Sequence, residues 1–282
     1  MMNSIVLSIG MAWALLLPLA WKWQLGMKRV SIFVSLSCVA FVCAFRLAGL
    51  DMSIWLNASV SAASSVAVAA AYLAYRFYRD PEREAPSSNG AIVSPADGVI
   101  IYVKSSRRGE LPVATKYGRQ CLVEELIKTP FYSSEAWVIG ISMSLLDVHV
   151  NRTPIGGRVI FQRHFPGKFG SLRVAEREFD NERATTMVQT DDLQVAIVQI
   201  ASRLVRQIVS YVEVGDELVP GQRVGAIRLG SQVDLILPVR PDLDVTVEVG
   251  AEVRAGETVL ATYAGKPHVD NPATLAELSV RR

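Results

Sequence analysis

Three short segments of the chain hold residue types that together could carry out nucleophilic chemistry. Ser231 directly follows Gly230, and a glycine at that place accepts strained backbone angles and leaves its carbonyl open to approach. Asp97 stands in a tight turn, and His149 is one of only three histidines. Serine, histidine and aspartate are the types of a nucleophile, its base and the group that orients the base.

Each of these residues also has an ordinary structural interpretation. A Gly-Ser pair between β stretches is most often a turn, and an aspartate in a Ser-Pro-Ala-Asp-Gly sequence is a common turn residue. A single histidine is often satisfied within a core or on the surface. The three residues alone therefore do not decide between chemistry and structure.

The elements that must position these residues begin with an apolar N-terminal region. Half of the 282 residues are hydrophobic, and the mean hydropathy of +0.28 is high for a soluble domain. No charged residue occurs in residues 1–21, 30–45 or 52–75. A membrane-spanning helix needs roughly 20 apolar residues. We therefore predict a membrane anchor over 1–76 with three transmembrane helices, or two if the second run is too short.

The flanking charges predict which way this anchor faces. Six cations lie on one side of the predicted membrane, and only Arg46 lies on the other; the six are Lys22, Lys28, Arg29, Arg76, Arg79 and Arg83. The positive-inside bias puts the rest of the chain in the cytoplasm. A cleavable signal peptide is the alternative for the first run, but that run lacks a positive start and two further apolar runs follow it.

The remainder of the chain reads as a polar linker over 77–90 and one mainly β domain over 91–282. Short Val/Ile-rich stretches predict strands at 91–93, 99–103, 137–142, 195–199 and 204–214. Helical periodicity is weak, and a short helix is expected only at 121–128.

An internal repeat supports the β prediction. Residues 212–227 align without gaps to residues 247–262 and match at eight of sixteen positions. Each copy implies a strand, a glycine turn and a second strand. The pattern resembles the hammerhead motif of barrel-sandwich hybrid domains, as in biotinyl and lipoyl carriers. Those carriers modify a lysine at a hairpin tip, but residues 228–246 contain no lysine, which disfavours a carrier.

Composition excludes several other classes. The 29 Lys+Arg against 27 Asp+Glu leave a net charge of +2, which is too balanced for the basic face of a nucleic-acid-binding protein. Three cysteines without CxxC spacing form neither a disulfide framework nor a structural zinc site. No metal site is expected.

Six blocks in order are similar to phosphatidylserine decarboxylase proenzymes, particularly the short form of many bacteria and archaea. They are FYRDPER at 77–83, SPADG at 94–98, DVHVNR at 147–152, PGKF at 166–169, NER at 181–183 and LGS at 229–231. The resemblance covers residues 77–238.

The resemblance implies a self-processing enzyme that is cut between Gly230 and Ser231. The β chain, 1–230, and the α chain, 231–282, would stay associated, and Ser231 would become a pyruvoyl group. A ketone conjugated to an amide can take up the electrons left by loss of CO2, which no ordinary side chain can do. Neither pyridoxal phosphate nor metal is then required. His149 would activate Ser231, and Asp97 would orient His149.

His149 would also protonate the α carbon, since its pKa ordinarily lies near neutral pH. The long form of the family has a second histidine where this chain has Arg152. His164 is the alternative second participant, whereas His268 in the C-terminal tail is expected to be structural or solvated. The substrate's phosphate or carboxylate would be bound by polar residues of the matched blocks: Lys168, Asn181, Glu182 and Arg183.

The resulting prediction is a phosphatidylserine decarboxylase in the inner membrane, with its substrate in the bilayer and its catalytic domain in the cytoplasm. The same chemistry on archaetidylserine, another serine-headed lipid or a free amino acid stays open, as does a homo-oligomer. From another class, a membrane-anchored hammerhead adaptor is the alternative. Such adaptors need long helical hairpins and a domain outside the cytoplasm, and the sequence predicts neither.

Overall fold

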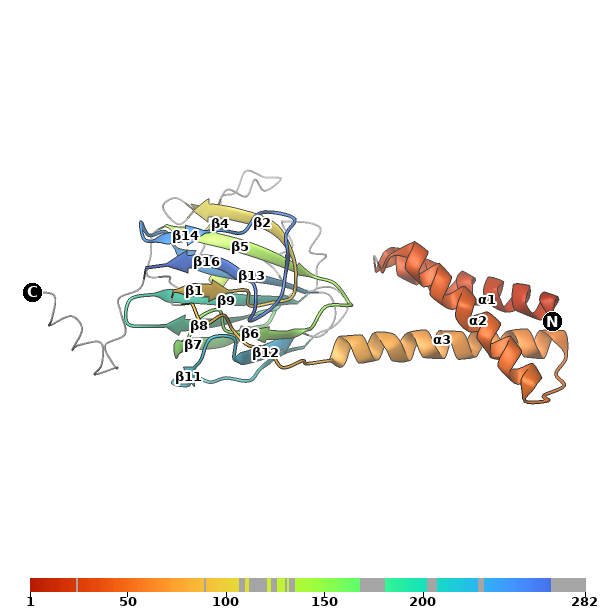
Figure 1. Cartoon of the computed structure of the whole chain (residues 1–282). Helices are drawn as coiled ribbons and strands as arrows, with labels where there is room; N and C mark the ends of the chain where they lie inside the picture. Colours follow the sequence, from red (N-terminus) through yellow and green to blue (C-terminus); the bar gives the residue numbers. More distant parts are fainter. Residues whose placement is uncertain are drawn as a thin grey trace, which may run out of the picture. The chain divides into compact units, whose positions relative to one another are not determined.

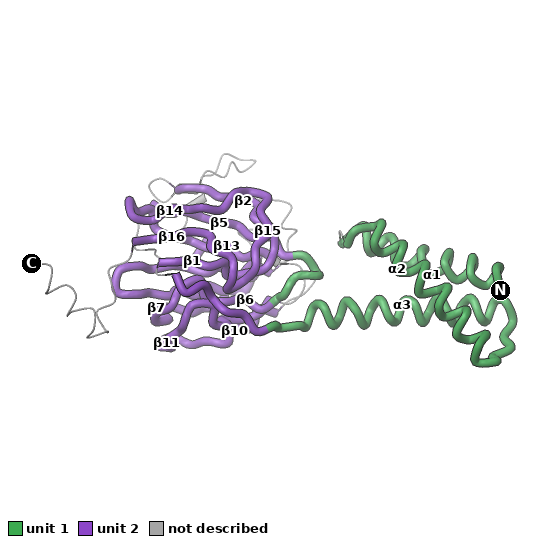
Figure 2. The backbone as a smooth tube through the Cα atoms, viewed as in Figure 1, with its two compact units in different colours: residues 1–81, 144–149 green, residues 82–143, 150–282 purple. Residues whose placement is uncertain are grey.

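The computed structural model describes residues 1–264 except 24, 89, 107–109, 112–120, 123–125, 130, 132–134, 168–180, 202–206 and 228–230. For residues 110, 111, 121, 122 and 231 it describes the backbone alone. The chain forms two compact units, Met1–Pro81 with Ser144–His149, and Glu82–Met143 with the rest of the chain from Val150 (Figure 2).

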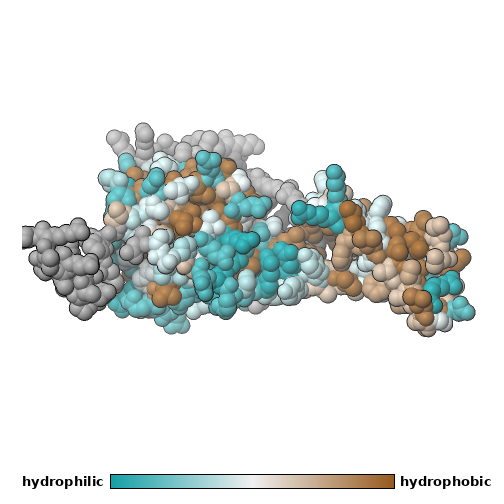
Figure 3. Space-filling view, in the orientation of Figure 1, coloured by the Kyte–Doolittle hydropathy of each residue, from teal (hydrophilic) through white to brown (hydrophobic). Residues whose placement is uncertain are grey.

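The first unit is built on three helices, α1 (Met2–Lys22), α2 (Met27–Leu47) and α3 (Ile54–Tyr78). Each packs against the other two. All three are long and apolar enough to cross a membrane, as the charge-free runs predict. Hydrophobic side chains gather over their outer surface (Figure 3), where a soluble bundle would carry polar ones.

Small and polar side chains fill the centre of this helical unit. Ala12, Cys38 and Ala62 are buried between the helices, and the Sγ of Cys38 lies 3.3 Å from the Oγ of Ser65. Small side chains let apolar helices approach closely, and hydroxyls bond between or within them when no water is present. The centre of this unit is therefore packed by small side chains and by contacts of polar groups with one another.

The second unit is a curled antiparallel sheet with smaller sheets beside it (Figure 1). Its eight strands run in the order β11-β7-β8-β9-β13-β5-β2-β15. Their bounds are Glu217–Leu218 (β11), Gly157–Phe165 (β7), Arg183–Gln189 (β8), Gln194–Ala201 (β9), Ser231–Pro238 (β13), Ala136–Met143 (β5), Gly98–Ser106 (β2) and Glu252–Val253 (β15).

Two three-stranded sheets and one two-stranded sheet complete this unit. The first three-stranded sheet holds β1 (Ala91–Val93), β16 (Val259–Tyr263) and β14 (Leu243–Val245). The second holds β10 (Ile208–Ser210), β12 (Arg223–Ile227) and β6 (Val150–Arg152). The last pairs β3 (Glu110–Leu111) with β4 (Cys121–Leu122).

The central strands of the large sheet are buried on both faces. Odd-numbered residues of β13, such as Val233 and Leu235, join one hydrophobic core with residues of the small sheets. Ile236 joins a second core, which Leu126, Ile127 and Phe131 help to form. Because apolar side chains are required on both sides, these strands read as continuous Val/Ile/Leu runs rather than as alternating ones.

The two copies of the sequence repeat pair their strands in the same way. In one copy β15 pairs with β2 and β16 with β1; in the other β11 pairs with β7 and β12 with β6. Glycines at matching places have positive φ, Gly215 with Gly250 and Gly221 with Gly256. These turns require glycine because other residues rarely adopt that angle. The barrel-sandwich hybrid assignment itself stays a prediction.

The sequence-based strands at 91–93, 99–103, 137–142 and 195–199 are confirmed within β1, β2, β5 and β9. The helix expected at 121–128 is wrong at its start, because Cys121–Leu122 forms strand β4. β4 forms because it pairs with β3. The periodicity of a short apolar run does not reveal such a partner. Of the strand expected at 204–214, residues 204–206 lie outside the described residues, and within 207–214 only Ile208–Ser210 is a strand.

Candidate active site

Ser231 is the first residue of β13, between the two central strands β9 and β5. Its backbone is in register with Ala201 on one side and Met143 on the other. Gly230, and with it the predicted cleavage bond, lies outside the described residues. The sheet thus fixes the backbone of the candidate nucleophile from both sides.

The strand that Ser231 begins contains a buried polar cluster. Asp234 is completely buried, and its Oδ1 accepts hydrogen bonds from the Tyr102 hydroxyl and the Gln232 amide, both at 2.8 Å. Gly140 makes room for the Tyr102 ring, because a Cβ there would lie within 2.4 Å of it. A buried carboxylate is costly unless it is hydrogen-bonded. This cluster therefore ties β13 to β2 three residues after Ser231.

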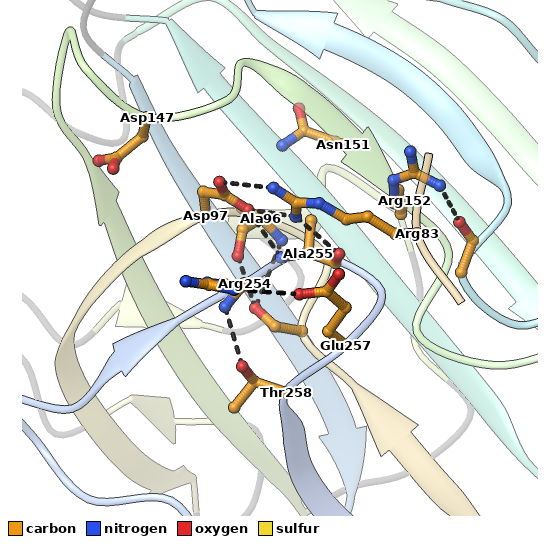
Figure 4. A network of polar contacts seen from close by, with 12 residues as sticks. Arg83, Ala96, Asp97, Asp147, Asn151, Arg152, Arg254, Ala255, Glu257 and Thr258 are labelled. Carbon is orange, nitrogen blue, oxygen red and sulfur yellow. Dashed lines mark hydrogen bonds and ion pairs between the residues drawn. The ribbon is translucent and has the colours of Figure 1, made fainter. Parts of the chain in front are cut away.

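Asp97, the second candidate, is buried and forms an ion pair with Arg83 (Figure 4). Nη1 and Nη2 of Arg83 donate to the two carboxylate oxygens, the latter at 2.8 Å. The backbone N–H of Ala255 also donates to Asp97 Oδ1 at 2.8 Å, and Arg83 donates to the Ala255 carbonyl. These three donors, two of them from the Arg83 cation, favour the ionised form of Asp97.

The turn at 94–98, which contains Asp97, has a counterpart beside the other copy of the repeat, and the counterpart shows which residues the turn requires. Residues 153–157, Thr-Pro-Ile-Gly-Gly, occupy the place of 94–98, and the two turns exchange backbone hydrogen bonds, Val93 to Pro154 and Arg152 to Pro95, both at 2.9 Å. In each turn the first hydroxyl bonds the carbonyl two residues on, at 2.7 Å for Ser94 and 2.6 Å for Thr153.

Asp97 itself is replaced in the second copy. Gly156 stands there, and Pro220 stands in place of Ala255. Pro220 has no N–H to be satisfied, and its ring fills the space, with Cδ 3.1 Å from where a Cβ of Gly156 would be. The turn can therefore form without an aspartate when the facing residue is a proline. Asp97 is not dictated by the turn alone.

His149, the third candidate, is described with the helical unit. It ends the loop Ser144–His149 and is 3% exposed. Its Nδ1 lies 2.9 Å from the carbonyl oxygen of Asp147, and its ring lies 4.3 Å from the ring of Phe77 at the end of α3. A carbonyl can only accept, so Nδ1 carries the proton and the lone pair of the neutral ring is on Nε2. A base requires such a lone pair.

The other predicted binding residues lie in the sheet unit, apart from Lys168, which is outside the described residues. His164 Nε2 lies 2.7 Å from Oε1 of Glu182. Arg183 is fully buried, and its Nη1 donates to the Leu126 carbonyl at 2.7 Å, which is a structural contact. Asn181 is buried as well. Their binding of substrate stays a prediction, and His268 lies outside the described residues.

Several residues that frame the site were not singled out from the sequence. Arg83, Tyr102, Gln232 and Asp234 make the two buried clusters described above. Asn151 accepts from Gln199 at 2.8 Å, and its amide lies 3.9 Å from the sulfur of Met143, the register partner of Ser231. One signal was present: Asp234 is a lone charge within an apolar strand. Within the described residues no cluster of His, Cys, Asp and Glu could hold a metal.

Asp97 and Ser231 belong to the sheet unit and His149 to the helical unit, so the Asp97–His149–Ser231 triad stays a prediction. Fold and site nevertheless define a class of protein. It is a β-sheet domain carried by apolar helices, with a candidate nucleophile at the head of a central strand and buried acidic and imidazole groups elsewhere in the chain.

Comparison with known proteins identifies the family. A family model described as phosphatidylserine decarboxylase matches residues 71–261. A Pelobacter propionicus phosphatidylserine decarboxylase proenzyme is 40% identical over 185 residues, 65% of this chain and 74% of the relative. A Methanocaldococcus jannaschii protein, provisionally named an archaetidylserine decarboxylase proenzyme, is 38% identical over 185 residues, 66% of this chain and 87% of the relative. The chain belongs to the phosphatidylserine decarboxylase family and is a decarboxylase proenzyme.

Proposed function

We propose that this chain cuts itself between Gly230 and Ser231 and then decarboxylates phosphatidylserine to phosphatidylethanolamine. The observation that carries the proposal is the place of Ser231 at the head of β13, paired on both sides. A new chain end at this position would be held by the sheet rather than released. That supports a reactive group at residue 231 with a fixed position.

Cleavage needs only the chain's own groups and water. A base removes the Ser231 hydroxyl proton, the oxygen attacks the Gly230 carbonyl, and the C–N bond breaks to give an ester. Loss of the Cα proton of residue 231 then breaks the ester C–O bond and leaves the Gly230 carboxylate. Water replaces the nitrogen, which departs as ammonia. His149 fits the base, because its neutral lone pair is on Nε2.

The pyruvoyl group so produced supplies the electron sink for decarboxylation. The residues present fit such a group: β13 fixes the backbone at 231, and the cluster of Tyr102, Gln232 and Asp234 holds the strand behind it. His149 would deliver the proton to the substrate's α carbon. The reaction proposed here uses no metal ion.

The strand pairing supports lasting association of the two cleaved chains. The segment 231–282 contributes β13, β14, β15 and β16. Of these, β13 pairs with β9 and β5, β15 with β2 and β16 with β1, all from 1–230. A core shared between the chains would be lost on separation.

The three apolar helices support a place in the cytoplasmic membrane, next to a substrate that exists only in the bilayer. The cation distribution supports a catalytic domain on the cytoplasmic side. The adaptor alternative is set aside, since the family is enzymatic.

The test is Ser231→Ala, which should leave one uncut chain of 30.8 kDa without decarboxylase activity. The hydroxyl is the sole source of the attacking oxygen, so the loss should be complete. Ser210→Ala is the matched control, another strand serine whose hydroxyl bonds only the Val212 carbonyl among the described residues; it should cleave normally. Decarboxylation at the wild-type rate by uncut Ser231→Ala protein would refute the proposal.

A second substrate follows from the name of the archaeal relative. Archaetidylserine has the same serine phosphate head on ether-linked chains, and nothing in the head-group chemistry separates the two lipids. Purified protein should be assayed on both lipids at equal surface concentration. A kcat/KM at least tenfold higher on archaetidylserine would replace phosphatidylserine as the proposed substrate.

A further inference from the structure

Two arginines at the C-terminal end of α3, one in its last turn and one at its C-cap, donate to one acceptor. Nη2 of Arg76 and Nη2 of Arg79 each donate to the carbonyl oxygen of Leu146, both at 3.1 Å. Residues three apart share a helix face. Two guanidinium groups are therefore held side by side over the loop that ends at His149.

In the described part of the chain, no carboxylate forms an ion pair with either arginine. Asp147, in the same loop, accepts from the backbone N–H of Ser144. The Nε atoms of both arginines are buried and have no hydrogen-bond partner among the described residues. Two adjacent cations with unused donors are the chemistry of a site that takes an anion.

The position of the two arginines at the end of α3 indicates which anion is near them. Arg76 lies in the last turn of the 25-residue apolar helix α3, and Arg79 is its C-cap residue. The tyrosines around them, Tyr72, Tyr75 and Tyr78, are exposed. Tyrosine and arginine at the end of a spanning helix mark the level of the lipid head groups. The anion concentrated at that level is the phosphate of a phospholipid.

We propose that Arg76 and Arg79 bind the phosphate group of the serine phospholipid substrate. This inference rests on the proposed function for the identity of the lipid. A phosphodiester offers two unesterified oxygens, which match the planar donors of two guanidinium groups. Tyr72 supports Arg76 by accepting from its Nη1 at 3.0 Å.

The arrangement also links substrate binding to the candidate base. Phe77 lies between the two arginines in sequence, and its ring packs against His149. The turn that would hold the phosphate thus also holds the imidazole, within one compact unit. Phosphate binding should accordingly change KM, while self-cleavage, which involves no lipid, should not depend on it.

The test compares Arg76→Gln/Arg79→Gln with Arg76→Lys/Arg79→Lys and with the matched control Arg46→Gln, which removes a cation from the last turn of α2. The substrate is dihexanoyl phosphatidylserine, which dissolves as single molecules, so attraction to a charged membrane does not enter. The glutamine pair should raise KM by about 10-fold to 100-fold with kcat within about threefold. The lysine pair should recover part of that loss, and Arg46→Gln should match wild type. Self-cleavage should be normal in all three.

A binding measurement keeps this inference separate from the proposed function, because it needs no turnover. Uncut Ser231→Ala protein, with and without the glutamine pair, is titrated with dihexanoyl phosphatidylethanolamine, dihexanoylglycerol and inorganic phosphate. The glutamine pair should weaken only the phospholipid by at least about tenfold, and inorganic phosphate should compete poorly.

An unchanged KM and unchanged phospholipid affinity would overturn the inference. Slower self-cleavage, with an unchanged KM of the protein that has been cleaved, would mean that the arginines only hold the His149 loop. Inorganic phosphate bound as tightly as the lipid would mean that free phosphate, not the head group, is the ligand.

Discussion

At the scale of single residues, Asp97 shows how a candidate catalytic group can be separated from a structural one. It satisfies the Ala255 N–H and the Arg83 guanidinium, and both contacts alone would explain a buried aspartate. The second copy of the repeat forms the same turn with Gly156 and Pro220. A variant that copies this alternative removes the carboxylate together with the two groups that donate to it.

The triple variant Arg83→Gln/Asp97→Gly/Ala255→Pro should fold and yet cleave itself much more slowly than wild type. Asp97→Ala alone leaves the Arg83 charge and the Ala255 N–H buried without their carboxylate, which costs about 3–5 kcal/mol. The triple variant avoids both penalties, so its free energy of unfolding should lie closer to wild type. If Asp97 supports the base, self-cleavage should still be slower by roughly 10³-fold.

Urea unfolding and the rate of appearance of the 231–282 fragment measure the two effects on the same samples. A triple variant that cleaves at the wild-type rate would show that Asp97 only holds the turn.

Residue identities were more accessible from the sequence than residue partners. Gly230-Ser231, His149 and Asp97 stand in short motifs whose types suggest chemistry. The bidentate contact of Arg83 with Asp97 was not predictable, because it depends on how the segment after α3 docks. The pairing of both α3 arginines with the Leu146 carbonyl likewise joins residues about seventy apart in the chain.

At the scale of elements, local sequence patterns predicted several of the strands. The features that were missed depend on pairing between distant segments. The Val/Ile-rich runs of β1, β5 and β9 are visible because each is buried on at least one face. The repeat 212–227 and 247–262 was visible through its glycines. Its partner segments, which contain β1 with β2 and β6 with β7, share too few residue types to be seen without the pairing.

Arg240 provides an element-scale prediction about pH. Its side chain donates to Asp242 at 2.6 Å and to the Asp192 carbonyl, joining the turn after β13 to the turn before β9. The hydrogen bond from Arg240 holds the pKa of the Asp242 carboxyl below its usual value. A carboxyl with a lowered folded pKa stabilises the fold above its unfolded pKa, and the effect is lost as pH falls through the folded value.

Arg240→Gln should therefore lower the melting temperature at neutral pH, and the difference from wild type should shrink as the pH falls below the usual carboxyl range. Tryptophan fluorescence during heating would follow this in detergent. Arg254→Gln, which removes an exposed arginine facing Glu257 at 3.8 Å, is the control. A difference that stays constant from neutral to acidic pH would contradict the assignment of the contact to Asp242.

At the scale of the whole molecule, the chain divides into an apolar helical unit and a β-sheet unit. The sequence predicted this division from the charge-free runs and the change to β patterns. Hydrophobic periodicity encodes the elements inside each unit, and it does not encode how two units are placed relative to one another. For that reason the triad that joins His149 to Asp97 and Ser231 stays a prediction.

The orientation proposed for the helices can be tested in the intact cell. A reporter enzyme that works only in the cytoplasm should be active when it is fused after Arg282. The reason is that the side of the helices with six flanking cations is expected to face the cytoplasm. The same reporter fused after Leu50, between α2 and α3, should show the opposite compartment. An Arg282 fusion active only outside the cytoplasmic membrane would contradict the orientation.

The central claim is that residue 231 becomes a ketone through self-cleavage, and peptide mass spectrometry after hydroxylamine treatment tests it most directly. Hydroxylamine captures a ketone as an oxime and should abolish decarboxylation. Two fragments are expected, 1–230 and 231–282, with the adduct on the peptide that begins at residue 231. An adduct on a lysine, or activity that appears only after pyridoxal phosphate is added, would contradict this claim.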